Sequence, residues 1–268
     1  MRCSLFARYA ALCCMCLVVS CTVGPKVQDG AVLTTNANVR GCKITVRFTR
    51  GTYFAHVKQI GFVKLIITPQ IAVWAEDTQG RYLQTLYVTH KFAKQDWGVV
   101  PHNKDSCFRT SSLPYWLNKY LHAGNKAPTT SSPLPDAVTA ATPAGCFDLN
   151  TTLAPASLPV IVKAEVNSSF DYNEAFGAKR QASHINGQPA LVYIARIGQD
   201  PRLNPSVSMH VAGHSGETGA DSLLHKDISG ITTAMNIFSC INVLVVPSAR
   251  GFVCPNRRNT EERAVKMH

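Results

Sequence analysis

Short runs of alternating apolar and polar residues recur along the chain and predict β-strands. Residues 42–48 are the clearest case, because Ile44, Val46 and Phe48 fall on one face and polar side chains on the other. Residues 70–75 and 82–89 flank a polar turn that ends in Gly80, which predicts a β-hairpin. The same pattern predicts further strands at residues 62–67, 158–166, 190–197 and 241–246.

Helical patterns are few. Residues 113–121 predict a short helix, with Pro114 in its first turn and Ser111 or Ser112 as the N-cap, and residues 232–238 predict another. Neither a βα alternation nor a glycine-rich phosphate loop is present, which disfavours a dinucleotide-binding fold. We therefore expect a mostly β chain: an antiparallel, immunoglobulin-like β-sandwich with one or two short helices.

One long segment interrupts this pattern. Residues 124–145 are rich in Pro, Ser, Thr and Ala, and Leu134 is their only large apolar residue. Such a composition buries little surface and predicts a surface loop or linker. We expect one sandwich domain over residues 41–247 with this loop inserted, followed by a polar, basic tail over residues 248–268.

The N-terminus has the order of an export signal. Arg2 and Arg8 precede an uncharged run over residues 9–19, which is too short to span a bilayer. This arrangement predicts a signal peptide over residues 1–20. Cleavage as an ordinary signal peptide near Ser20 or Val23 is the alternative.

Residues 17–21 (Leu-Val-Val-Ser-Cys) resemble a bacterial lipobox. The resemblance implies cleavage before Cys21, a lipid on Cys21, and a lipidated tether over residues 21–40. It also places the protein at the periplasmic face of a bacterial membrane, with the lipid as its anchor.

The chain is basic, with a formal charge of +11, of which Arg2 and Arg8 contribute two units. The basic residues are scattered without an aromatic stripe, so we expect no nucleic-acid partner, and an anionic membrane or cell-wall surface fits better. The cysteines after Cys21 are too widely spaced for a zinc finger or c-type haem, and export permits disulfides whose pairing the sequence leaves open. They are Cys42, Cys107, Cys146, Cys240 and Cys254.

Three segments together resemble a bacterial family of predicted periplasmic proteins of unknown function. Residues 71–97 carry Trp-x-Glu-Asp and Thr-Leu-Tyr, residues 136–145 carry Asp-Ala-Val-Thr-x-Ala-Thr, and residues 162–197 carry Glu-Val-Asn-x-Ser-Phe-Asp-Tyr-Asn and Gly-Gln-Pro. Members of this family are associated with flavin transferase and membrane redox proteins. The resemblance therefore implies a β-fold outside the cytosol and a role in electron transfer with such partners.

Residues 136–142 also resemble the acceptor motif of exported FMN-binding domains. The resemblance implies that a flavin transferase joins FMN covalently to Thr142 through a phosphoester, with Asp136 and Thr139 in the cofactor-binding segment. The small Ala140 and Ala141 suit a hydroxyl that must enter another enzyme.

Two features depart from that motif. Ala140 stands where Gly is usual, and Pro143 restricts Thr142 to extended conformations. The alternative interpretation is structural, with Asp136 as an N-cap before a turn of small residues. We thus expect an electron carrier or accessory protein rather than an enzyme with its own substrate, and the rival function is a non-redox envelope protein that acts as a binding or structural module.

Other candidate groups are weaker. His210 and His214 have the i, i+4 spacing of a helical metal pair, but the residues between them are poor helix formers and no third ligand is near. Glu76 and Asp77 could form an acid–base pair or simply decorate the hairpin turn. Aromatic side chains could stack on a flavin ring or pack in the core; they are Trp97, Tyr115 and Trp116.

Overall fold

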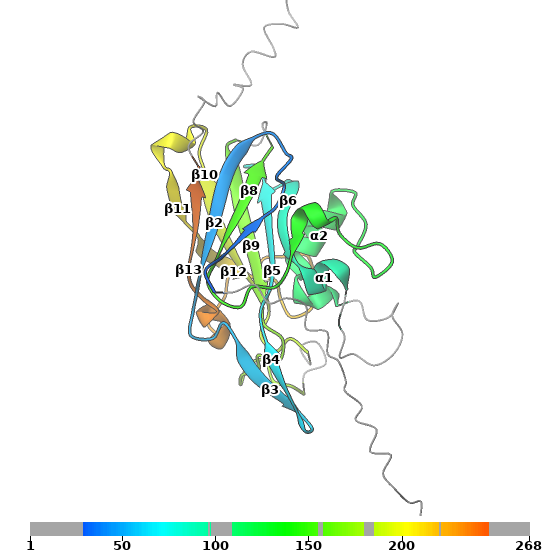
Figure 1. Ribbon diagram of the computed structural model, residues 1–268. Helices are drawn as coiled ribbons and strands as arrows, with labels where there is room; N and C mark the ends of the chain where they lie inside the picture. Colours follow the sequence, from blue (N-terminus) through cyan, green and yellow to red (C-terminus); the bar gives the residue numbers. More distant parts are fainter. Residues whose placement is uncertain are drawn as a thin grey trace, which may run out of the picture.

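Two β-sheets packed face to face form the body of the molecule (Figure 1). The computed structural model describes residues 29–95, 97, 109–154, 158–179, 185–219 and 221–246. The predicted signal peptide, Cys21 and the basic tail from residue 248 lie outside these residues. The prediction of a mostly β chain with a β-sandwich is confirmed.

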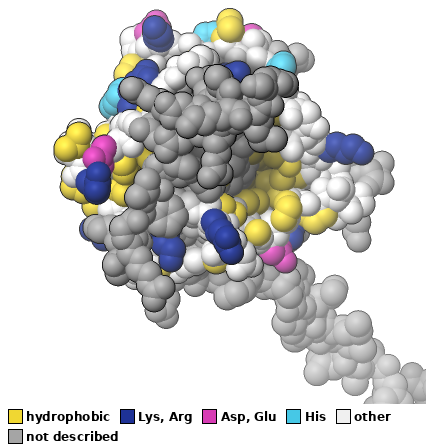
Figure 2. Space-filling model, turned by 90° about the horizontal axis from the view of Figure 1, so that it is seen from above, with side chains coloured by type: hydrophobic (Ala, Val, Ile, Leu, Met, Phe, Trp, Pro, Cys, Tyr) yellow, Lys and Arg dark blue, Asp and Glu magenta, His cyan; other side chains and the backbone are white. Residues whose placement is uncertain are grey.

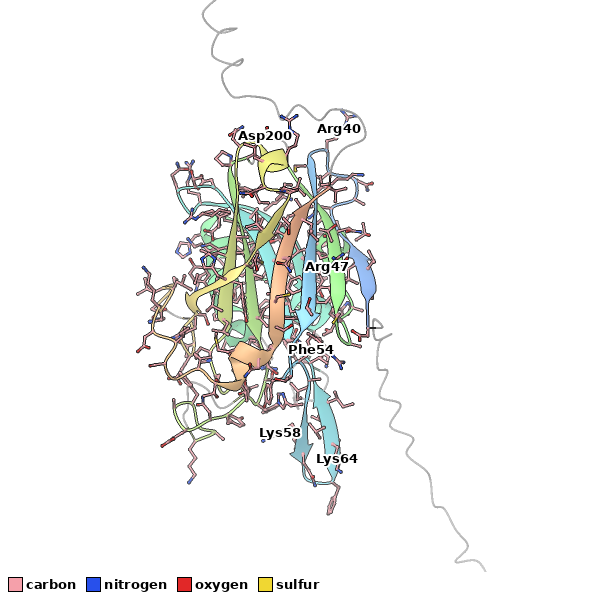
Figure 3. All side chains as sticks on the ribbon, turned by 90° about the vertical axis from the view of Figure 1, so that its left-hand side faces the viewer. Arg40, Arg47, Phe54, Lys58, Lys64 and Asp200 are labelled. Atoms are coloured by element: carbon pink, nitrogen blue, oxygen red, sulfur yellow. The ribbon has the colours of Figure 1, made fainter. Side chains whose placement is uncertain are left out.

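The first sheet has the order β1-β8-β2-β13-β11 and the second has the order β12-β10-β9-β5-β6-β7. The first consists of β1 (Ala31–Thr34), β8 (Phe147–Leu153), β2 (Cys42–Arg50), β13 (Phe238–Val245) and β11 (Ser206–Ser208). The second consists of β12 (His210–His214), β10 (Leu191–Ile197), β9 (Val160–Asn167), β5 (Gln70–Glu76), β6 (Tyr82–Thr89) and β7 (Thr139–Ala140). A separate hairpin of β3 (His56–Ile60) and β4 (Val63–Ile67) projects from one end of the sandwich (Figures 1 and 3).

The main core lies between the two sheets. Ile44, Val46 and Phe48 of β2 are buried in it, as their period of two predicts. Phe48 stacks on Phe147 of the neighbouring strand, with ring centroids 4.4 Å apart. This aromatic pair lies where the two chain segments run side by side, so it helps to fix their register.

A second core lies on the other face of the second sheet, under a helical layer. The layer contains α1 (His90–Lys94) and α2 (Pro114–His122), and Trp74, Trp116 and Phe92 are fully buried beneath it. Strands β5 and β9 are therefore buried on both faces along their whole length. The molecule has three layers where the sequence predicted two.

Both predicted helices need correction. Helix α2 forms as predicted, but its N-cap is Leu113, without a side-chain cap from Ser111 or Ser112. Residues 232–238 form only a 3₁₀ turn, η6 (Thr233–Asn236), because the chain enters β13 at Phe238.

The predicted tether is wrong from residue 29 onwards. Strand β1 pairs with β8 in parallel, and Thr35 and Asn36 are buried beyond it. Strand β7 also pairs in parallel, with β6, so the sheets are antiparallel except at these two edges. The folded domain thus begins about a dozen residues before the predicted boundary at residue 41.

A pair of neighbouring threonines tests whether this N-terminal segment belongs to the domain. The Thr35 hydroxyl is buried and donates to the Leu86 carbonyl oxygen at 2.6 Å, whereas Thr34 is exposed. We expect Thr35→Val to lower the free energy of unfolding by about 1–3 kcal/mol, because a buried acceptor loses its donor. Thr34→Val is the matched control and should stay within about 0.5 kcal/mol in urea denaturation. Equal, negligible effects would show that the segment is a tether after all.

Candidate functional site

The predicted flavin-acceptor segment lies at the edge of the second sheet. Asp136 begins the 3₁₀ turn η2 (Asp136–Val138), which is capped by Pro135 rather than by Asp136 itself. Thr139 then pairs with Val88 in the short strand β7. Thr142 follows in extended chain and is half-buried, and its hydroxyl has no hydrogen-bond partner among the described residues.

Several contacts hold this segment on the domain. Lys94 of α1 forms an ion pair with Asp136 at 2.6 Å, and its charge and hydrogen bond lower the pKa of that exposed carboxyl. The Leu134 side chain is buried, and its amide donates to the Ala93 carbonyl oxygen at 3.0 Å. The amide of Asn36 donates to the Ala137 carbonyl oxygen at 2.8 Å. The predicted loop over residues 124–145 is thus mostly at the surface, but residues 134–140 are docked on the domain and include the two-residue strand β7.

A groove of about 450 Å³ opens beside this segment. Tyr82 and Tyr120 form one side, with their ring centroids 5.9 Å apart, and Pro135 and Val138 contribute from the acceptor segment. Burial raises the pKa of Tyr82 to about 12, so its phenol is neutral at physiological pH. The volume and the aromatic lining are typical of a site for a small planar ligand.

Two of the aromatic residues considered for flavin stacking are unavailable for it. Trp116 is fully buried and stacks on Tyr120 at 5.0 Å, and Tyr115 is buried above the second sheet. The Trp97 ring lies against the guanidinium of Arg109, 4.3 Å from its centroid. The packing interpretation is correct for Trp116 and Tyr115. The sequence analysis missed Tyr82 and Tyr120 because one lies on β6 and the other on α2, and no local pattern links them.

A buried ion pair lies beneath the helical layer. Glu76 is fully buried, and its carboxylate lies 2.7 Å from the ammonium of Lys163 on the neighbouring strand β9. The indole of Trp74 donates to the other carboxylate oxygen at 2.8 Å, and Lys163 contacts the Tyr115 hydroxyl at 3.3 Å. Glu76 is thus no turn decoration and is separated from Asp77, which is bonded to backbone amides in the turn.

Glu165, two residues further along β9, holds the start of α2. Its two carboxylate oxygens accept the backbone amides of Tyr115 and Trp116 at 3.0 and 2.7 Å. A carboxylate at a helix N-terminus satisfies free amides and the positive end of the helix dipole. Burial nevertheless raises the pKa of Glu165 to about 8, against the opposing effect of the two amides.

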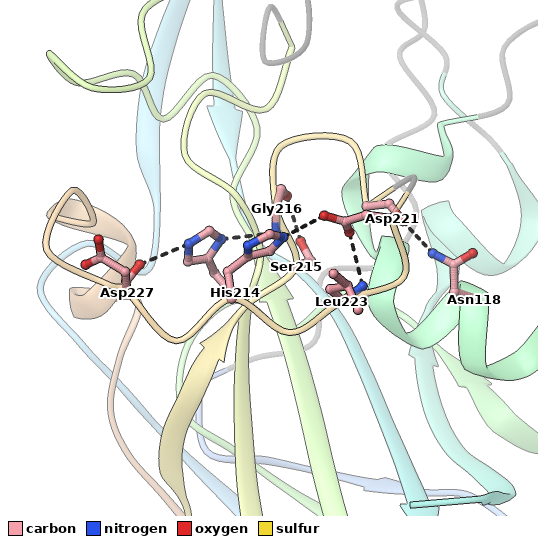
Figure 4. A network of polar contacts seen from close by, with 9 residues as sticks. Asn118, His214, Ser215, Gly216, Asp221, Leu223 and Asp227 are labelled. Carbon is pink, nitrogen blue, oxygen red and sulfur yellow. Dashed lines mark hydrogen bonds and ion pairs between the residues drawn. The ribbon is translucent and has the colours of Figure 1, made fainter.

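The structure does not bring His210 and His214 together as a metal pair. Both lie on strand β12, where four residues span roughly 13 Å, whereas a helix would place them on one face a single turn apart. His214 instead stacks on His225, with ring centroids 5.2 Å apart, and His225 contacts Asp221 at 2.7 Å (Figure 4). Within the described residues no group of three or more candidate ligands could hold a metal ion.

The His214 ring is tied to the surrounding backbone. It accepts the Gly216 amide at Nδ1 and contacts the Asp227 carbonyl oxygen at 3.1 Å through Nε2 (Figure 4). Burial lowers its pKa, and the nearby His225 adds to that effect. These bonds close a loop at the sheet edge, which is a structural role.

Polar residues from the family-like segments gather at the end of the sandwich near the hairpin. Asp171 is buried and receives a hydrogen bond from Thr233, and burial raises its pKa. His56 lies near it, 3.4 Å from the Ser168 hydroxyl. These residue types match a hydrolase triad, but Ser168 is buried, so its hydroxyl cannot reach a substrate.

The remaining motif residues join distant segments at this end. Gln188 accepts the Thr232 amide at 2.6 Å, and Asn173 donates to the Gly230 carbonyl oxygen at 2.9 Å. Gly187 has a φ of +75°, and a Cβ there would lie 2.1 Å from the Asp171 carbonyl oxygen. The Asn-Gly-Gln pattern is therefore explained by close backbone packing.

Of the described cysteines, Cys146 and Cys240 are free thiols. The Cys146 sulfur accepts the Arg50 amide on one side of β2, and Cys240 pairs with Thr49 on the other. Two strand spacings separate these cysteines by roughly 9–10 Å, beyond the reach of a disulfide. Cys107 and Cys254 lie outside the described residues.

No family model, curated protein or solved structure matches the chain. Among the described residues, no helix is long and apolar enough to cross a membrane. Seen from above, basic side chains are dispersed among neutral and hydrophobic ones (Figure 2).

The raised pKa of Glu165 predicts a pH dependence of stability. Between about pH 5 and pH 8 the folded protein retains a proton that the unfolded chain releases, so the free energy of unfolding falls as pH rises. Integrated over that window, this residue contributes a fall of roughly 3 kcal/mol. We expect Glu165→Gln to remove that slope in urea denaturation at each pH. Glu174→Gln, at an exposed position, is the control, and an unchanged slope in Glu165→Gln would contradict the assignment.

Proposed function

We propose that the protein is an exported lipoprotein, anchored through Cys21 at the periplasmic face of a bacterial membrane, that carries FMN on Thr142 and passes electrons to a membrane redox partner. The observation that carries the flavin assignment is the position of Thr142. Thr142 is half-buried, its hydroxyl has no hydrogen-bond partner among the described residues, and it follows an edge strand of only two residues.

The residues around Thr142 suit the attachment. A phosphoester forms when the hydroxyl oxygen attacks the phosphorus of an activated FMN donor, and the hydroxyl proton and the donor's leaving group depart. Ala140 and Ala141 leave room for a transferase, and the carbonyl oxygen of Ala141 receives only a long 3.5 Å bond from Tyr87. The two-residue pairing of β7 is the main contact that the transferase would have to loosen.

The groove supplies a surface for the flavin ring. FMN accepts and donates electrons through its planar isoalloxazine ring, which is joined to its phosphate by a ribityl chain. Val138 of the groove lies four residues before Thr142, a span of at most about 14 Å. The groove is lined by Tyr82 and Tyr120, one of which would offer its face to the flavin ring and the other its edge, because the two rings are nearly perpendicular.

The rival function uses the same groove without a covalent cofactor. A binding module would take an envelope component of similar size in the groove beside Tyr82 and Tyr120, and Thr142 would remain unmodified. The immunoglobulin-like class stays a prediction in either case, supported by the two facing sheets.

Intact mass distinguishes the two functions. We expect the exported protein, co-expressed with a flavin transferase, to gain the mass of FMN less one water, in addition to the acyl groups on Cys21. Thr142→Ala should lose the flavin mass completely and keep the acyl groups, because only the hydroxyl nucleophile is removed.

Thr130→Ala is the matched control, since it removes an exposed hydroxyl of the same long loop outside residues 136–142. A flavin adduct that persists in Thr142→Ala, or no adduct at all with an active transferase, would reject the proposal at Thr142. Cys21→Ser should remove the acyl mass alone, so the anchor and the flavin are tested separately.

A further inference from the structure

The β3–β4 hairpin is the most exposed apolar element among the described residues. Its strands are joined by the two-residue turn Gly61-Phe62, and Gly61 has a φ of +57°, as a tight hairpin turn requires. Phe62 at the tip is 106% exposed, and Ile60 and Val63 beside it are exposed as well. An aromatic side chain that stands clear of the protein on a projecting tip has no structural role in the fold.

The base of the hairpin, in contrast, is fixed to the sandwich. The ammonium of Lys58 lies 5.5 and 5.1 Å from the ring centroids of Phe170 and Tyr172. The His56 ring stacks on Tyr53 at 4.9 Å. These contacts hold the hairpin away from the body, so that the tip is presented rather than folded back (Figure 3).

The charge of the hairpin indicates which kind of surface its tip would bind. Residues 51–70 contain Lys58 and Lys64 and no acidic residue. Lys64 is exposed on the second strand, and a lysine on an open edge strand opposes pairing with a second copy of the same hairpin. Apolar residues at a tip with basic residues behind them match an anionic lipid surface, where the apolar groups enter the headgroup region and the lysines contact the phosphates.

The position of Asp29 is consistent with a membrane contact at the hairpin. Asp29 accepts the Cys146 amide at 2.5 Å, and the Cys146 sulfur accepts the amide of Arg50, the last residue of β2. The chain passes from Arg50 into the hairpin within six residues, so Asp29 lies at the end of the sandwich from which the hairpin projects. Asp29 is the eighth residue after Cys21, a reach of at most about 29 Å, and the five residues of β3 extend roughly 17 Å.

We propose that the β3–β4 hairpin is a second membrane contact, which inserts Ile60, Phe62 and Val63 into the headgroup region of an anionic bilayer. This inference rests on the proposed extracytosolic membrane location, but it requires neither the lipid nor the flavin. Two contacts, the lipid and the hairpin, fix the orientation of the domain, whereas a single flexible lipid attachment leaves it free to rotate.

Vesicle binding of unacylated protein tests the proposal. The chain from residue 22 onwards contains both hydrophobic cores and lacks Cys21, so its binding is independent of the lipid, and the hairpin variants report the contribution of the hairpin. We expect it to sediment with vesicles of phosphatidylcholine and phosphatidylglycerol, and weakly with phosphatidylcholine alone. Phe62→Ser should lower the partition coefficient about tenfold, and Lys64→Gln about fivefold at low salt.

Leu203→Ser is the matched control. Leu203 is also exposed, but it follows Asp200 at the opposite end of the sandwich (Figure 3), and its replacement should leave binding within about twofold. A thermal unfolding midpoint of Phe62→Ser equal to that of the parent would show that the loss is not misfolding, because Phe62 packs against nothing. Phe62→Trp should in addition show a blue-shifted emission when anionic vesicles are added.

Two results would overturn the proposal. Equal partitioning of the parent chain and Phe62→Ser would exclude the tip as the contact. A concentration-dependent dimer that Phe62→Ser abolishes, without vesicle binding, would assign the tip to a second copy of the chain. Failure of acylation at Cys21 would appear in the intact mass and would leave the vesicle result unaffected.

Discussion

The outer layer of the molecule depends on the contact between the Glu165 carboxyl group and the first amides of α2. This carboxyl group is the only side chain among the described residues that caps the helix, because Leu113 at the N-cap has no polar group. It fixes α2 against β9 at one end. Trp116 and Tyr120 then follow on the face of α2 that packs against the sheet and forms one side of the groove.

A short chain of hydrogen bonds connects this contact to the side chains that line the groove. The Trp116 indole donates to the Thr85 hydroxyl at 3.2 Å, and the same oxygen lies 2.6 Å from the Tyr82 hydroxyl. Tyr82 and Tyr120 are thereby held at the groove by groups that are themselves fixed by Glu165. A ligand in the groove would meet side chains that are already ordered, which reduces the entropy cost of binding.

The buried Glu76–Lys163 pair also lies beneath the helical layer, but its burial carries a larger desolvation cost. Taking both charges out of water is offset by their contact and by the hydrogen bonds from Trp74 and to Tyr115, so removing one partner would leave an uncompensated buried charge. Together with Glu165, the pair determines the position of α2 on β9, whose outer face carries polar side chains. An alternative packing of α2 would have to leave one of these groups unsatisfied.

The sequence predicted the strands well because burial on one face imposes a period of two, as in Ile44, Val46 and Phe48. The same periodicity gave a wrong expectation for β9, because the second face of this strand is also buried. Lys163 and Glu165 alternate with Val162 and Ala164, and this pattern is typical of a solvent-exposed face, yet α2 covers it. Only the position of a helix some 50 residues earlier in the chain makes these charges buried, and no local pattern contains that information.

The acceptor segment shows the same limit. Its Pro, Ser and Thr content indicates a loop, but the buried Leu134 and contacts with residues far away in the sequence, such as Asn36 and Lys94, dock it on the domain. The β3–β4 hairpin was half predicted for a related reason. Residues 62–67 are an apolar run interrupted only by Lys64, whereas β3 carries His56, Lys58 and Gln59 and has no buried face of its own.

The hairpin, the N-terminal chain at Asp29 and the segment that follows Thr142 all lie at one end of the sandwich. Thr142 lies four residues before Cys146, which is bonded both to Asp29 and to the last residue of β2. The segment proposed to carry the flavin therefore approaches the same end as the N-terminal chain and the hairpin. If the hairpin tip and the Cys21 lipid both contact the bilayer, the domain can present Thr142 only on the membrane side. A redox partner within that membrane would then meet the flavin without a large movement of the domain, whereas a soluble partner would find this end partly covered by lipid.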